Sequence, residues 1–279
     1  MDITKIKIVA DSSSDMLQLI GYDFCSAPLK IRTDKKEYTD DINLDVEGMV
    51  NDLLKYSGKS TTACPSPDDW LSSFGDAEYV FCVTITSNLS GSYNSACTAK
   101  GLYEEQYPDR KVHVFDSLST GPEMQLIIEK IGEYIKDGQS FDEICNSVNE
   151  YCKQTSLLFM LESMKNLANN GRVSPLVAKM AGLLGIRVVG KASDVGTLEV
   201  IEKCRGEKKA LASLLENMKE LGFNGGKVKI SNCFNPEAAE TLREMILKEF
   251  KNASVEIYKS RGLCSFYAEK GGLLIGFEH

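Results

Sequence analysis

The stretch YVFCVTITSNLSGSYNSACTA, residues 79–99, decides the fold of this chain. Its first seven residues are apolar or β-branched, which fits a strand buried on both faces of a parallel sheet. A polar loop follows, and the composition of residues 93–107 predicts a helix that Pro108 ends. The unit is therefore a strand, a hydroxyl-rich loop and a helix.

The loop within this unit is a candidate binding site. Ligands of open α/β sheets bind at the carboxyl ends of strands, and a helix N-terminus presents unpaired N–H groups to an anion. Ser90, Gly91 and Ser92 are therefore predicted to hold a small anionic group. The alternative is that Ser90 or Ser92 only caps the helix, because serine is a preferred N-cap residue.

The same order of elements recurs along the first half of the chain. Residues 5–10 (KIKIVA) and 111–115 (KVHVF) are predicted strands, and polar residues follow both. Two pairs, Thr120 with Glu123 and Ser140 with Glu143, have the spacing of capping boxes that begin helices. Strands and helices in alternation indicate a doubly wound parallel sheet in an N-terminal α/β domain, residues 1–156.

The second half, residues 157–279, reads as another α/β domain, with a mixed sheet. Residues 157–161 are apolar and a short helix is predicted at 162–168. Strands are predicted at 197–202, 227–231, 255–258 and 273–277, and helices from residue 203 and from Pro236. The first half carries 14 basic and 26 acidic side chains, whereas the second carries 18 and 14. The opposite net charges of the two halves favour two domains with different functions.

Composition excludes several classes of protein. The chain has 279 residues and a net charge of 32 − 40 = −8, the opposite balance from most nucleic-acid binders. It lacks an apolar run of the ~20 residues needed to cross a bilayer and a secretory signal, so a cytoplasmic protein with no integral membrane segment is expected. Nine cysteines scattered singly and two histidines argue against a metal site or a disulfide framework.

An enzymatic function is the less favoured alternative. A serine hydrolase would use Ser90 or Ser92, but the sequence has no G-x-S-x-G motif, and His113 falls within a predicted strand. Cys64 as a nucleophile has no evident base. Phosphate and dinucleotide fingerprints are also missing.

Six motifs, in order over nearly the whole chain, resemble those of the DegV family of bacterial fatty-acid-binding proteins. They are Asp11-Ser12-Ser13-Ser14-Asp15; Thr62-Ala63-Cys64-Pro65-Ser66-Pro67, similar to T-S-Q-P-S-P; Ser90-Gly91-Ser92-Tyr93-Asn94-Ser95-Ala96, similar to S-G-T-Y-Q-S-A; Asp116-Ser117; Asn170-Gly171-Arg172-Val173-Ser174, similar to G-G-R-I-S; and Lys203-Cys204-Arg205-Gly206, similar to K-x-R-G.

The resemblance implies a non-catalytic carrier that needs no cofactor and holds one long-chain fatty acid in a tunnel between two domains. Thr62 and Ser92, helped by the Ser90-Gly91 backbone, would bind the carboxylate. A separate fatty acid kinase, similar to dihydroxyacetone kinases, would phosphorylate that carboxylate to an acyl phosphate for phospholipid synthesis. Arg172 and Arg205 would contact the head group or the kinase, or pair with nearby carboxylates.

The chain departs from the family pattern near its C-terminus. Phe266 stands where the family's G-T-H-T-G has its histidine, so Ser265, Tyr267 or Arg261 is expected to replace that contact. A different small amphiphile is therefore an alternative ligand. The apolar residues of 177–188 and Phe277 are candidates for the tunnel wall, with ordinary core packing as the alternative.

Overall fold

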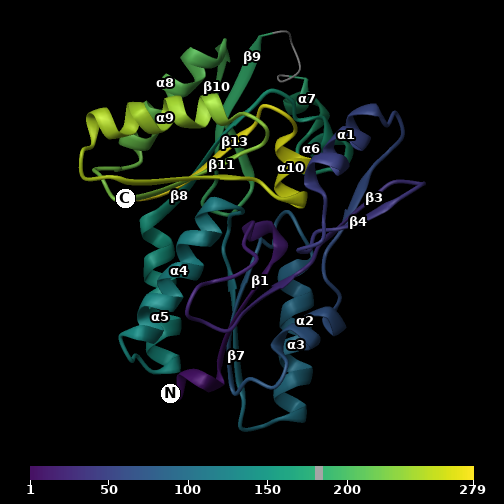
Figure 1. Cartoon of the computed structure of the whole chain (residues 1–279), viewed down its shortest axis with the longest axis vertical. Helices are drawn as coiled ribbons and strands as arrows, with labels where there is room; N and C mark the ends of the chain where they lie inside the picture. The colour runs from purple at the N-terminus through teal and green to yellow at the C-terminus, as the bar shows by residue number, and fades with distance from the viewer. Residues whose placement is uncertain (180–184) are drawn as a thin grey trace.

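The computed structural model describes residues 1–179 and 185–279, and it stacks two large sheets one above the other (Figure 1). The lower sheet in this view is parallel, with the strand order β2-β1-β6-β7. Its strands are β1 (Ile6–Asp11), β2 (Phe24–Ala27), β6 (Tyr79–Thr84) and β7 (Lys111–Asp116). The loops that follow β1, β6 and β7 face the upper sheet.

Helices cover both faces of this parallel sheet. One face packs against α4 (Pro122–Lys136) and α5 (Phe141–Tyr151), and the other against α2 (Pro67–Phe74) and α3 (Ser92–Gln106). Phe81 of β6 stacks on Phe141, with ring centroids 4.9 Å apart. Val80 and Cys82, which point to the opposite face, join the cluster of Trp70 and Phe74. A strand buried on both faces explains the unbroken run of apolar and β-branched residues at 79–85.

The upper sheet is mixed, with the order β10-β9-β8-β13-β11-β12. Its strands are β8 (Thr155–Leu161), β9 (Ile186–Ala192), β10 (Leu198–Arg205), β11 (Lys227–Asn232), β12 (Ser254–Lys259) and β13 (Leu273–Glu278). Helices α8 (Glu207–Glu220) and α9 (Pro236–Glu249) cover its outer face. Its inner face packs on α6 (Lys165–Asn169), α7 (Pro175–Ala178) and α10 (Gly262–Ala268).

A third, small sheet stands at the side of the molecule, in the order β4-β3-β5. Its strands are β3 (Lys30–Arg32), β4 (Glu37–Thr39) and β5 (Thr61–Ala63), and α1 (Val46–Lys55) packs beside it. Strand β5 carries Thr62 and holds it extended, as expected for a segment that precedes Pro65. The sheet thus brings a polar residue toward α10.

The turn between β9 and β10 joins the two large sheets directly. Asn88 Nδ2 donates a hydrogen bond to the carbonyl of Val195 at 2.6 Å. Gly196 next to it has a φ of +73°, and a Cβ there would lie 2.9 Å from the Leu118 Cα. Only glycine permits this close approach of the upper sheet to the loop after β7.

The predicted fold class is confirmed, while two local expectations are wrong. Helix α4 begins behind Gly121 without a side-chain cap, and Glu123 instead accepts a hydrogen bond from the Thr155 hydroxyl at 2.7 Å. Strand β10 extends through Arg205, so the helix expected at residue 203 begins only at Glu207. The capping box of Ser140 with Glu143 is confirmed. Among the described residues, none of the helices is both long and apolar enough to span a bilayer.

Candidate functional site

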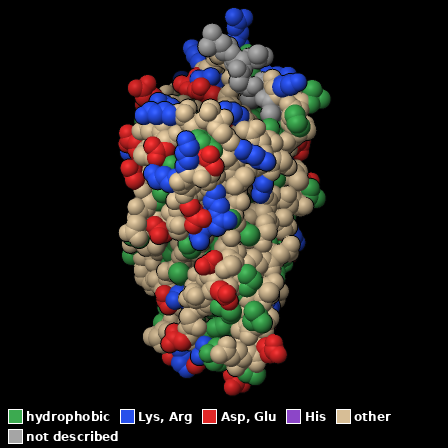
Figure 2. Space-filling model, turned by 90° about the vertical axis from the view of Figure 1, so that its right-hand side faces the viewer, with side chains coloured by type: hydrophobic (Ala, Val, Ile, Leu, Met, Phe, Trp, Pro, Cys, Tyr) green, Lys and Arg blue, Asp and Glu red, His purple; other side chains and the backbone are tan. Residues whose placement is uncertain are grey.

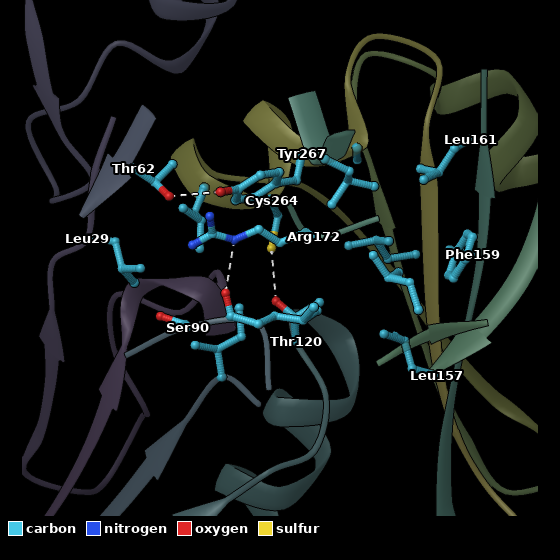
Figure 3. A pocket seen from close by; sticks show the side chains of 17 residues that line it. Leu29, Thr62, Ser90, Thr120, Leu157, Phe159, Leu161, Arg172, Cys264 and Tyr267 are labelled. Carbon is cyan, nitrogen blue, oxygen red and sulfur yellow. Dashed lines mark hydrogen bonds between the residues drawn. The ribbon is translucent and has the colours of Figure 1, made fainter. Parts of the chain in front are cut away.

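A pocket lies between the loops of the lower sheet and the inner face of the upper sheet (Figure 3). It encloses about 680 Å³ of empty space, its open mouth included. Its lining comprises Leu29, Thr62, Ile85, Leu89, Ser90, Thr120, Leu157, Phe159, Leu161, Leu167, Arg172, Leu198, Leu263, Cys264, Tyr267, Ala268 and Leu274. Its polar side chains gather at one end, where Leu29 lies beside Thr62 and Ser90, and the opposite end is apolar (Figure 3).

Hydroxyl groups gather at one end of the pocket. Thr62 Oγ1 lies 2.8 Å from the Tyr267 hydroxyl, so two segments some two hundred residues apart meet there. Ser90 Oγ accepts a hydrogen bond from the Ser92 N–H at 3.2 Å. Its own O–H proton has no acceptor within the described part of the chain, and it remains available to a ligand. Burial raises the pKa of Tyr267, which keeps its hydroxyl protonated.

Arg172 brings a positive charge to this polar end. Its Nε donates to the carbonyl of Leu89 at 3.0 Å, and its Nη1 donates to the carbonyl of Asn170. Both partners are neutral, and over residues 1–179 and 185–279 Arg172 forms no ion pair. A half-buried guanidinium without a carboxylate partner favours an anionic ligand, which would satisfy its remaining donors.

The opposite end of the pocket is apolar. Leu157, Phe159 and Leu161 alternate along β8, so all three side chains point to the same face of the sheet (Figure 3). Leu274 of β13 pairs with Phe159 across the strands, and Leu198 of β10 extends the surface. The pocket is therefore amphipathic, with donors at one end and hydrocarbon at the other.

Ser92 is fully buried behind the pocket rather than in its lining. Its hydroxyl donates to Asp11 Oδ2 at 2.6 Å, and the N–H of Ile85 donates to the same oxygen at 3.0 Å. Asp11 Oδ1 accepts from the N–H and the hydroxyl of Ser13. Burial raises the pKa of Asp11 and these donors oppose that shift. Asp11 thereby fixes the loop that carries Ser90, and Gly91 is the N-cap residue of α3.

Three other predicted contacts also lie outside the pocket. The Ser265 hydroxyl is 2.8 Å from the Ser260 hydroxyl and is buried. Arg261 lies just before α10, where its Nη2 donates to the carbonyl of Asp41. Arg205 is exposed at the end of β10. Of the predicted residues, the structure brings Thr62, Ser90, Arg172 and Tyr267 together in the pocket.

Phe266, which stands at the position of the family's histidine, does not line the pocket. Its ring is buried among Ile31, Tyr38, Met49 and Val50, on the side of α10 that faces α1. The next residue, Tyr267, is the one in the pocket. The sequence indicated Tyr267 only as one of three substitutes, and it did not indicate Thr120, in the loop before α4, or Cys264 as pocket residues. Which residues of α10 face the pocket depends on the rotation of that helix about its axis.

The tunnel-wall candidates are core residues where the structure describes them. Phe277 is fully buried against Phe223 under the outer helices, and it points away from the pocket. Val177 and Val188 pack around Phe159 but do not line the pocket. Residues 180–184, part of the same candidate stretch, lie outside the described residues.

Nothing in the described pocket forms a nucleophile and base pair. His113 lies on β7, where its ring packs on Phe115 and burial lowers its pKa. Burial raises the pKa of Cys64, which disfavours its thiolate. The Cys264 thiol donates to the carbonyl of Ser13 at 3.2 Å. The geometry supports binding an amphiphile rather than cleaving one.

The fold and pocket define a class of two-sheet α/β proteins with an amphipathic pocket between the sheets, and comparison with known proteins identifies the family. The family model described as "Uncharacterised protein, DegV family" matches residues 5–278. A DegV domain-containing protein of Streptococcus pneumoniae is 44% identical over 276 residues, which cover 98% of each chain. The chain belongs to the DegV family.

Two solved structures are similar over almost the whole chain. A DegV family protein from Eubacterium eligens loaded with heptadecanoic acid is 45% identical, with a TM-score of 0.96 over 98% of this chain and 99% of that one. The Fatty Acid Kinase (Fak) B3 protein of Streptococcus pneumoniae, loaded with linoleic acid, is 44% identical, with a TM-score of 0.96 over the same shares.

Proposed function

We propose that this chain is a lipid-binding carrier that holds one long-chain fatty acid in the pocket. The observation that carries the proposal is the division of the pocket into an end with hydroxyls and Arg172 and an end of leucines and Phe159. The relatives loaded with heptadecanoic and linoleic acid, at 45% and 44% identity, support it.

The carboxylate would bind at the polar end. Arg172 supplies the charge, Ser90 a free O–H donor, and the Thr62–Tyr267 pair a second donor, because only one of its two protons is used between them. Ser92 contributes through Asp11 and the Ser90 loop rather than by direct contact. A carboxylate taken out of water needs several such donors to offset its lost hydration.

The acyl chain would lie against the inner face of the upper sheet. Each buried methylene stabilises the complex by about 0.8 kcal/mol, so a long chain contributes on the order of 10 kcal/mol before the cost of ordering it. The tail therefore supplies most of the affinity, and the polar end selects for an acid.

The carrier would act in the cytoplasm and present the carboxylate to a separate fatty acid kinase, which performs the chemistry. The S. pneumoniae relative named as a Fatty Acid Kinase B protein supports this partner.

Arg205 is exposed and outside the pocket, so it is available for docking that kinase rather than for binding the lipid. Kinase capture by the wild-type protein but not by Arg205→Ala would support this role, and equal capture would exclude it.

The decisive experiment is mass spectrometry of the protein purified from bacteria, first under native conditions and then after solvent extraction. We expect one extractable fatty acid per chain. An Arg172→Gln, Thr62→Val double variant should lose it. A protein that carries no lipid, or a neutral amphiphile, would contradict the proposal.

A further inference from the structure

Helix α10 forms part of the pocket wall, but its own N-cap residue provides no side-chain cap for its first backbone N–H groups. Leu263, Cys264, Tyr267 and Ala268 of this helix all line the pocket. Arg261, the residue before the helix, makes no side-chain capping bond. The first backbone N–H groups of α10 are bound instead by two carboxylates from the N-terminal half of the chain.

Asp40 and Asp15 bind three successive N–H groups. Asp40 Oδ1 accepts from Gly262 at 3.0 Å, and its Oδ2 accepts from Leu263 at 2.8 Å. Asp15 Oδ1 accepts from the Arg261 N–H at 2.8 Å, while its Oδ2 accepts from the Ser231 hydroxyl at 3.1 Å. The helix start is thus fixed in position by oxygens that come from two separate loops.

The fit between Asp40 and α10 is close. A Cβ at position 262 would lie 2.6 Å from both the carboxylate of Asp40 and the side chain of Leu44, so only glycine allows the contact. Both carboxylates are buried, and Arg261 Nε lies 3.9 Å from Asp40 Oδ1. Burying two charges costs free energy that a well-packed apolar pair would avoid. Their arrangement indicates a role in positioning rather than in stability alone.

We propose that Asp40 and Asp15 are positioning residues of the head-group site: by holding the start of α10, they set the Tyr267 hydroxyl against Thr62. Tyr267 lies five residues after Gly262 on a short helix that is held at its beginning, so a shift there moves the hydroxyl. The inference rests on the proposed fatty-acid function, and neither carboxylate lines the pocket.

A double-mutant cycle tests this inference with two probes, a fluorescent conjugated 18-carbon fatty acid and its methyl ester. Asp40→Asn leaves one N–H facing an amide NH₂, because asparagine offers one acceptor where Asp40 offers two. We expect Asp40→Asn and Tyr267→Phe each to weaken binding of the acid about tenfold. The double variant should bind the acid at most about twofold more weakly than either single variant, because the two changes disturb the same contact. Binding of the ester should change less than about twofold.

Additive losses, or an equal loss for acid and ester, would overturn the positioning role. The control Ser140→Ala removes a capping side chain at α5, far from the pocket, and should leave both affinities unchanged. If Asp40→Asn does not fold, Asp15→Ala replaces it in the same cycle, because alanine removes the acceptor of the Arg261 N–H at the start of α10. A wild-type protein that binds the ester as tightly as the acid would instead contradict the proposed function, and the positioning role with it.

Discussion

The two ends of the pocket are built in opposite ways. The apolar end rests on one sheet, where Leu157, Phe159 and Leu161 follow the two-residue period of β8 and the neighbouring strands add Leu274 and Leu198. The polar end is assembled from β5, the loop before α3, the turn after α6, and α10, which contribute one residue each. A surface for hydrocarbon needs only one face of a regular sheet, whereas a site for a charged group needs donors that converge from many directions.

The largest effect should come from making the apolar end resemble the polar one. Leu274→Asp places an uncompensated charge against Phe159 and should weaken fatty-acid binding by more than about 100-fold, because a buried carboxylate without partners is very costly. Binding of a fluorescent fatty acid measures this, with circular dichroism to verify folding.

The matched control is Val195→Asp, which adds the same charge at a position 59% exposed. It should bind the ligand as the wild type does. Retained binding by folded Leu274→Asp would show that the acyl chain lies elsewhere.

The next largest effect concerns the charge at the polar end. Arg172→Gln should cost about 2 kcal/mol, roughly 30-fold in affinity for the acid, because hydrogen bonds to charged groups are the strong ones. Affinity for the methyl ester should stay unchanged. Arg243→Gln, which breaks an exposed pair with Glu240 on α9, is the control. An equal loss for acid and ester would place the carboxylate away from Arg172.

A smaller effect is expected from the neutral hydroxyls. Thr62→Val removes one donor at nearly constant volume and should cost about 1 kcal/mol, or about fivefold in affinity for the acid. Isothermal titration calorimetry with acid and alcohol ligands of one chain length resolves this change. The corresponding change on the surface of α3, Thr98→Val, should have no effect on binding. No change in Thr62→Val would exclude the Thr62–Tyr267 pair as a donor.

The last prediction concerns stability rather than affinity, and it links the polar end to pH. Burial raises the pKa of Asp15 from 3.8 to about 7. Between pH 4 and pH 7 the folded state therefore retains a proton that the unfolded state has lost, and the free energy of unfolding falls as pH rises. Asp15→Asn should make this decline shallower by at most about 1.4 kcal/mol per pH unit.

Urea unfolding at several pH values measures the slope. A decline remains in the variant, because burial also raises the pKa of Asp11, Asp40 and Glu123. The exposed replacement Asp109→Asn should leave the wild-type slope intact. If the free energy of unfolding of Asp15→Asn changed with pH as steeply as that of the wild type, Asp15 would be ionised in the folded state over the whole range from pH 4 to pH 7.

The sequence was sufficient for the fold class, the family and most strands, because periodicity and strand burial are local properties. The run at residues 79–85 is apolar or β-branched at every position, since β6 is covered on both faces. The division into domains at residues 156 and 157 stays a prediction. Strand β8 begins at Thr155, close to that position.

The site was predicted less completely, and α10 shows why. All of its residues except Tyr267 are buried, so its sequence carries no amphipathic pattern that reveals which face meets the pocket. Cys264, Tyr267 and Ala268 share one face at a spacing of three and four residues, which leaves Ser265 and Phe266 pointing elsewhere. Tyr267 faces the pocket and its neighbour Phe266 does not, because successive residues point in different directions around the helix axis. In our proposal, Asp15 and Asp40 set the rotation of α10 that decides between them.

The capping of α10 also bears on how the protein folds. The bonds from Asp40 to Gly262 and Leu263 span 222 and 223 residues, and that from Asp15 to Arg261 spans 246. Contacts this distant along the chain form slowly, because a long loop must close before they contribute. The start of α10 can therefore be fixed only after nearly all of the chain has been synthesised. We expect a nascent or C-terminally truncated chain to capture no lipid, so loading follows folding.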